Sequence, residues 1–85
     1  TGQVTFNSCH FINWGLGGDA NAPAIDAQAG GLTISACDFM DEGKNQARIA
    51  AGVKSAIVTA SRLRGGQKID NQAGEAAQIG LNTVG

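Results

Sequence analysis

Three residues able to carry charge stand at the same place in three similar phrases of the sequence. His10 in "VTFNSCHF", Asp38 in "LTISACDF" and Arg62 in "AIVTASRL" each precede the last apolar residue of their phrase. If the phrases stack as neighbouring strands, Asp38 lies between His10 and Arg62 at strand spacing. An imidazole, a carboxylate and a guanidinium in a row could bind an acidic sugar or deprotonate it. The same row could also be a plain surface charge ladder, which contributes ~0–1 kcal/mol per pair.

The three phrases belong to a repeat that occurs four times along the chain. The fourth copy is "AQIGLNTV", and the copies start near residues 4, 32, 56 and 77. Apolar and polar residues alternate in each copy, which is typical of a strand that buries one side. We therefore expect the first, third and fifth positions to face inward together. These positions are Val4, Leu32, Ala56 and Ala77, then Phe6, Ile34, Val58 and Ile79, then Ser8, Ala36, Ala60 and Leu81.

A second and shorter phrase lies between the copies and predicts a further strand in each repeat. It reads "PAIDA", "ARIAA" and "QKIDN", in which Ile25, Ile49 and Ile69 line up. Length differences between repeats fall between the two phrases and are largest in the loop 12–22. Solenoid proteins accept insertions in this way, because loops swell while the stacked strands keep their register.

The pattern predicts an all-β fold, a right-handed parallel β-helix (β-solenoid) of about three and a half rungs. The 85 residues allow one domain, 1–85, and the 13 glycines suit short strands joined by tight turns. A leucine-rich repeat would need an "LxxLxL" frame followed by a helical turn, which the chain lacks. A β-sandwich would favour Asn-Gly or Asp-Gly hairpins, and neither dipeptide occurs.

The phrases "VTFNSCHF", "LTISACDFMDEG" and "SAIVTASRLRGG" resemble the right-handed parallel β-helix proteins of the pectate-lyase-like superfamily. That group includes pectate and rhamnogalacturonan lyases, polygalacturonases and phage tailspikes. The resemblance covers most of the chain, and the shared motif is a signature of the fold more than of an activity. It implies a buried ladder of small polar residues, matched here by Cys9, Cys37, Ser61 and Asn82.

The resemblance also implies a function for the row of charged residues. We expect a segment, the C-terminal part, of an extracellular or cell-surface protein that binds or acts on acidic polysaccharide. Lyases of the group abstract a proton beside a uronate with a basic side chain, and Arg62 is the residue to test for this role, with Asp38 and His10 beside it. The enzyme class would be polysaccharide lyase or glycoside hydrolase, although we do not expect this segment to be catalytic by itself.

The basic residues form a local band in a chain whose net charge is −1. All six lie within residues 44–68, where no acid occurs. The strand alignment places Arg48 beside Lys68 and Asp26 beside Asp70, so flanking rungs neutralise part of the band. Lys44, Lys54 and Arg64 remain to hold a polyanion, or are simply solvated. Trp14, the one tryptophan, is either a platform for sugar stacking or a cover for the core.

We predict no metal site and no cofactor, and calcium has only weak support. Asp38, Asp41 and Glu42 are close in sequence, and "GLGGDANAP" has a glycine–aspartate character, but Ca²⁺ needs ~6–8 oxygen ligands. Cys9 and Cys37 share one column, where parallel side chains disfavour a disulfide, so two free buried thiols are expected.

Composition excludes other partners. The pI of about 5.5 argues against nucleic acid as a partner, and the chain has no run of 18 apolar residues that could span a membrane.

Open solenoid ends expose unpaired strand edges. We therefore expect further rungs of the same chain, or copies stacked end to end. The alternative function is a non-catalytic structural or adhesive solenoid that assembles in this way.

Overall fold

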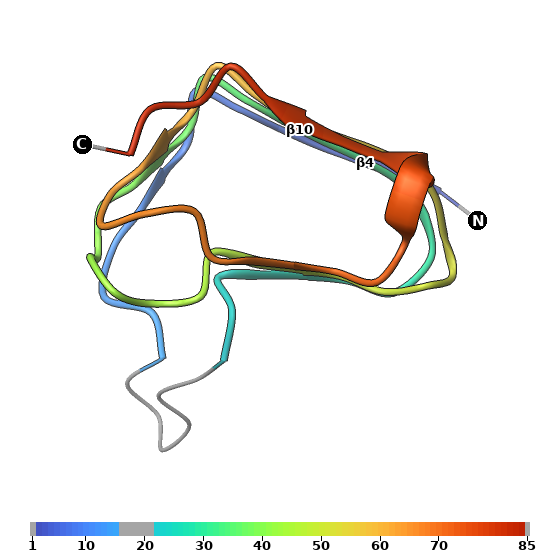
Figure 1. Cartoon of the computed structure of the whole chain (residues 1–85), viewed down its shortest axis with the longest axis horizontal. Coiled ribbons are helices and arrows are strands. Elements are labelled where there is room, and N and C mark those ends of the chain that lie inside the picture. The colour runs from blue at the N-terminus through green and yellow to red at the C-terminus, as the bar shows by residue number, and fades with distance from the viewer. Residues whose placement is uncertain (1, 16–21, 85) are drawn as a thin grey trace.

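The computed structural model describes residues 2–15 and 22–84, which form a parallel β-solenoid of about three turns. Viewed along its axis, successive turns lie over one another (Figure 1). Every paired strand in the described part of the chain runs parallel to its neighbours. The all-β prediction is confirmed, while the right-handed sense stays a prediction.

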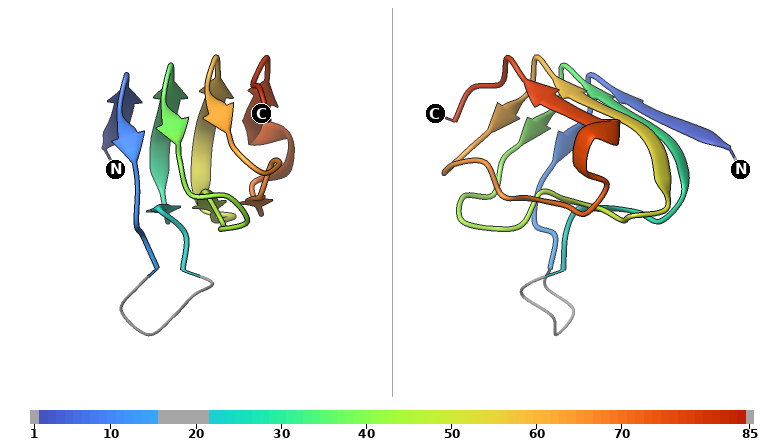
Figure 2. Two further views of the ribbon diagram at one scale, coloured as in Figure 1. Left: turned by 90° about the vertical axis from the view of Figure 1, so that its left-hand side faces the viewer. Right: turned by 45° about the vertical axis from the view of Figure 1, so that its right-hand side comes forward.

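Each of the three turns, or rungs, contributes one strand to each of three sheets, and a last strand begins a fourth turn in the first sheet. Sheet A has the order β1-β4-β7-β10, sheet B β2-β5-β8 and sheet C β3-β6-β9. The rungs lie side by side from β1 at one end to β10 at the other (Figure 2). A short 3-10 helix, η1, leads into β10. The strands and the helix are β1 Gln3–Asn7, β2 His10–Phe11, β3 Ile25–Ala27, β4 Gly30–Ser35, β5 Asp38–Phe39, β6 Ala47–Ile49, β7 Val53–Thr59, β8 Arg62–Leu63, β9 Ile69–Asn71, η1 Gly74–Ala76 and β10 Ala77–Gly80.

Sheet A confirms the predicted register of the long repeat. Its first column is Val4, Leu32, Ala56 and Ala77, and its second is Phe6, Ile34, Val58 and Ile79. The columns close the interior because each rung packs its apolar side on the rungs above and below it. In the middle of the stack the result is a dry core, in which Ile34, Val58 and Phe39 are fully buried.

The prediction for the fifth position is wrong, because the chain turns a corner there. Ser8, Ala36, Ala60 and Leu81 all have φ between 53° and 59°, and all four are exposed, Leu81 to 90%. A residue in the left-handed region breaks the alternation of a strand. The residue after the corner therefore faces inward, three places after the last inward residue instead of two: Cys37 follows Ile34 in this way, and Ser61 follows Val58.

The predicted ladder of small polar residues lies just inside this corner. Ser61 Oγ donates to the Thr59 carbonyl at 3.0 Å and accepts from the Cys37 backbone N–H at 3.1 Å. Asn82 Oδ1 accepts from the Ser61 N–H at 2.9 Å. Each side chain thus satisfies backbone groups that the corner removes from the sheets, which explains why small polar residues recur there.

The predicted register of the shorter phrase is wrong by two residues in the middle rung. Ile25 pairs with Ala47, and Ala47 with Ile69, whereas Ile49 lies beside Ala27. A shift of two residues keeps the same side chains facing inward, so the apolar pattern alone does not distinguish the two registers. As a consequence Arg48 stands between Asp26 and Asp70, and not beside Lys68 as predicted.

None of the described helical segments is long and apolar enough to cross a membrane.

Candidate functional site

A shallow groove on the outside of sheet B holds the three charged residues singled out from the sequence. The strands β2, β5 and β8 follow directly on the corner, so the residue after each ladder position points outward. His10 pairs with Asp38 and Asp38 with Arg62 in register, as predicted. The groove has a volume of about 390 Å³ and is lined by His10, Ala36, Cys37, Asp38, Ala60 and Arg62.

Asp38 is held by Arg64, a residue that was assigned to a different group of cations. Arg64 Nε donates to Oδ1 at 2.9 Å, and Nη2 donates to Oδ2 at 2.8 Å. This two-point pairing is the main cause that lowers the pKa of Asp38, opposed by burial and assisted by the charges of Arg64, Arg62 and His10. The same pairing raises the pKa of Arg64. Asp38 is therefore an ionised anchor at neutral pH and a poor proton acceptor.

His10 and Arg62 are the groups of the groove that remain open to a ligand. Both are exposed, and Arg62 makes no ion pair with any residue that the structure describes. On its other side Arg62 bridges to Thr83, a neutral residue. Arg62 lies beside Asp38, whose carboxylate is already paired with Arg64. The guanidinium of Arg62 therefore lies next to a carboxylate that another arginine neutralises.

Two of the predicted ligand-binding residues form a separate, self-contained cluster. Lys44 Nζ donates to the Trp14 carbonyl at 2.6 Å and to Asp41 Oδ2 at 2.7 Å, and it lies 5.7 Å from the centre of the Trp14 ring. Asp41 has a lowered pKa, first because of Lys44. Trp14 packs edge-on against Phe39 and donates to the Asn45 carbonyl at 2.9 Å. This geometry matches a cover over the core, which is one of the two predicted roles for Trp14.

The last predicted binding residue, Lys54, lies away from the groove. It is exposed at a register shift of β7, where Gly30 pairs with Val53 and Gly31 with Ser55. The structure brings together His10, Asp38, Arg62 and Arg64, and it separates Lys54 and the Lys44–Trp14 cluster from them.

The described part of the chain contains no group of three or more His, Cys, Asp or Glu that could hold a metal. Asp38 and Asp41 are each occupied by a cation of the chain itself. The glycine-rich motif 15–23 lies largely outside the described residues. Cys9 and Cys37 are both free thiols, as expected, but only Cys37 is buried, whereas Cys9 is partly exposed. Burial raises the pKa of Cys37.

Sequence reasoning missed the role of two residues in this part of the molecule. Arg64 was predicted to hold a ligand, whereas its guanidinium pairs with Asp38, and its position two residues after Arg62 is the signal that could have indicated this. Gln46 gave no signal: its side chain is fully buried, accepts from the Lys68 N–H at 2.6 Å and donates to the Gly66 carbonyl at 2.9 Å. It thereby fixes the turn that follows the two arginines.

Comparison with known proteins gives no significant match to a family model, a curated protein or a solved structure. The parallel β-solenoid itself is compatible with a β-helix fold. The fold and the geometry of the groove are therefore the basis on which a function can be argued.

Proposed function

We propose that this chain is a binding segment of an extracellular β-helix protein of the pectate-lyase-like kind, and that its groove on sheet B holds an acidic polysaccharide. The observation that carries the proposal is the open guanidinium of Arg62 beside a carboxylate that Arg64 already neutralises. A carboxylate of the polymer can approach Arg62 without competing with Asp38 for it. His10, two strands away in the same column, offers a second contact.

The same geometry favours binding over cleavage. A general base for proton abstraction needs free oxygens and enough basicity to take a proton, whereas Asp38 has a lowered pKa and both of its carboxylate oxygens accept from Arg64. The groove is shallow and open, so it does not exclude water from a reacting centre as a catalytic cleft would. We infer a surface that grips a polyanion by its charges, with no chemical step of its own.

Binding of oligogalacturonate, compared with an uncharged glucan of similar length, tests this proposal. We expect the acidic polymer alone to bind, and Arg62→Ala to weaken binding by roughly tenfold, as loss of a charge-assisted hydrogen bond does. Lys54→Ala is the matched control, because it removes one positive charge from a different face. Equal weakening by both variants would show that only net charge matters, and no binding by the parent chain would reject the proposal.

Incubation of the chain with polygalacturonate separates binding from catalysis. We expect no unsaturated product in ultraviolet absorbance and no new reducing ends. Product that disappears in Arg62→Ala would instead establish a lyase.

A structural solenoid that assembles end to end is the second candidate, and the parallel stacking of sheet A, whose outer strands among the described residues are β1 and β10, favours it. Filaments in electron micrographs, together with no binding of acidic polymer, would support it over the first.

A further inference from the structure

Asp38 has two arginines of the neighbouring rung beside it. Arg62 is its partner in the register of β5 and β8, one strand spacing of about 4.8 Å away. Arg64 follows two residues later and reaches back diagonally to the same carboxylate. Arg64 forms the ion pair, while Arg62 has none within residues 2–15 and 22–84. One carboxylate therefore has two candidate partners, and the structure shows which of them it takes.

Arg64 occupies both oxygens of Asp38. Its Nε donates to Oδ1 at 2.9 Å and its Nη2 donates to Oδ2 at 2.8 Å. Two parallel bonds from one planar group are stronger and more directional than a single contact. The pair is also sheltered, since the side chain of Asp38 is 15% exposed and that of Arg64 is 33% exposed. Arg62 has the neutral Thr83 on its other side, so Asp38 is the carboxylate that Arg62 meets in this column once Arg64 releases it.

The turn after Arg64 fixes the backbone from which its side chain starts. Gly65 has a φ of 84°, and a Cβ at this position would lie 2.9 Å from the backbone nitrogen of Gly43. Only glycine fits such a place. The carbonyl of Gly66 accepts at 2.9 Å from the side chain of Gln46, which is fully buried. The turn is therefore held on two sides, and Arg64 leaves it next to Asp38.

We propose that Arg64 is a positioning residue of the groove: by holding Asp38, it keeps the guanidinium of Arg62 free for an acidic ligand. The inference rests on the proposed function and adds a closed state to it, in which Asp38 pairs with Arg62 and the ligand is excluded. The two states differ in one ion pair, so their populations depend on which arginine binds the carboxylate more tightly. Arg64 contacts Asp38 in this scheme and does not contact the ligand.

The rate at which phenylglyoxal modifies Arg62 tests the inference without any polysaccharide. The reagent attacks free guanidinium groups, and fragment masses of proteolytic peptides assign the modification to one arginine. We expect Arg64→Ala to slow the modification of Arg62 by about two- to fivefold, because Asp38 then pairs with it in an exposed place. Arg64→Ala combined with Asp38→Asn should regain the parent rate. Arg64→Lys should lie between, since one ammonium group does not occupy both oxygens.

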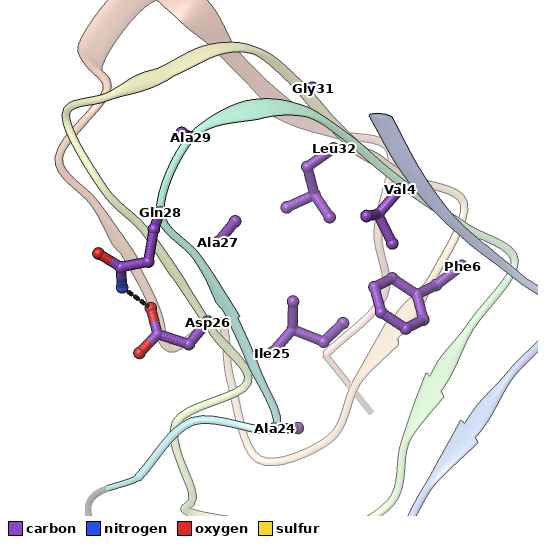
Figure 3. Close-up of a pocket in the computed structure, with 10 residues that line it drawn as sticks. All are labelled: Val4, Phe6, Ala24, Ile25, Asp26, Ala27, Gln28, Ala29, Gly31 and Leu32. Atoms are coloured by element: carbon purple, nitrogen blue, oxygen red, sulfur yellow. Dashed lines mark hydrogen bonds between the residues drawn. The ribbon is translucent and has the colours of Figure 1, made fainter. Parts of the chain in front are cut away.

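The matched control combines Arg64→Ala with Asp26→Asn. Asp26 lies on sheet C, where the side chain of Gln28 donates to it (Figure 3). This variant has the same net charge as the first double variant but keeps Asp38, so we expect Arg62 to stay slow. Equal recovery in both double variants would show that net charge alone sets the rate. An unchanged rate in Arg64→Ala would overturn the inference, and Arg64→Lys replaces that variant in every comparison if it does not fold.

Binding of oligogalacturonate to the same variants connects the inference to the groove. We expect Arg64→Ala to weaken binding by about two- to fivefold, and the added Asp38→Asn to restore it. If Arg64 instead bound the polymer itself, both variants would bind equally weakly, which would overturn the positioning role. If no variant bound the polymer while the modification rates followed the expected order, the proposed ligand would be rejected and the role of Arg64 in freeing Arg62 would be confirmed.

Discussion

The first and second rungs carry nearly the same phrase, yet they are buried very differently. Leu32 and Ile34 in the second rung are 3% and 0% exposed, while Val4 in the first is 53% exposed and Phe6 is only partly buried. The strands of the two rungs pair residue for residue, Val4 with Leu32 and Phe6 with Ile34. The difference therefore comes from position in the stack, because among the described residues the second rung has a neighbour on each side and the first has one.

This comparison shows that a solenoid rung has no core of its own. Phe39 lies 4.7 Å from Phe11, ring centre to ring centre, with an interplanar angle of 8°. Both rings belong to one column, but only Phe39 is enclosed by rungs on both sides, and it is fully buried. Stability is a sum over interfaces between rungs, so equivalent residues should contribute according to how many interfaces they join.

The largest expected effect follows from that difference. We expect Phe39→Ala to lower the free energy of unfolding by about 3–5 kcal/mol, since it opens a cavity between two interfaces. Phe11→Ala should cost about 1–2 kcal/mol, because the ring of Phe11 is already partly exposed. Denaturant titration followed by circular dichroism measures both. Equal losses in the two variants would contradict the view that position in the stack sets the contribution.

The sequence predicted the stacking of sheets A and B well, because their columns are defined by apolar residues at a fixed spacing from the corner. It failed where the pattern has two solutions. The middle rung of sheet C could place Ile49 or Ala47 beside Ile25, and both registers bury apolar side chains. Only the full set of backbone hydrogen bonds, such as that from the Ile25 N–H to the Gln46 carbonyl, selects one.

The candidate site was predicted in part for a similar reason. The column of His10, Asp38 and Arg62 depends on backbone register alone, and the sequence contains it. The pairing of Asp38 with Arg64 depends on how a long side chain reaches diagonally to the neighbouring strand, which register does not determine. Lys44 was predicted to hold a ligand, but its ammonium group donates to the Trp14 carbonyl and to the Asp41 carboxylate.

The second prediction compares two glutamines, one inside the solenoid and one outside. We expect Gln46→Leu to cost about 1–3 kcal/mol, because it leaves the Lys68 N–H and the Gly66 carbonyl without their partner in a buried place. Gln28 is exposed, and among the described residues its side chain bonds only that of Asp26, so Gln28→Leu should change stability by less than about 0.5 kcal/mol. Thermal unfolding of the two variants beside the parent measures the contrast. A larger loss in Gln28→Leu would show that the buried bonds contribute little.

The smallest expected effect concerns the ion pair of the second rung and its dependence on pH. The folded pKa of Asp38 is lower than that of a free aspartate, so the pair stabilises the fold above the usual aspartate value of about 3.9 and ceases to do so as the pH falls through the lower folded value. Asp38→Asn should therefore be less stable than the parent at neutral pH, and the two stability curves should converge in acid. The pair of Lys44 with Asp41 has the same sign and is present in both proteins, so some acid sensitivity remains in the variant. Urea titrations from pH 7 down to pH 2 measure the difference, and parallel curves over that range would mean that the bond to Arg64 does not stabilise the fold.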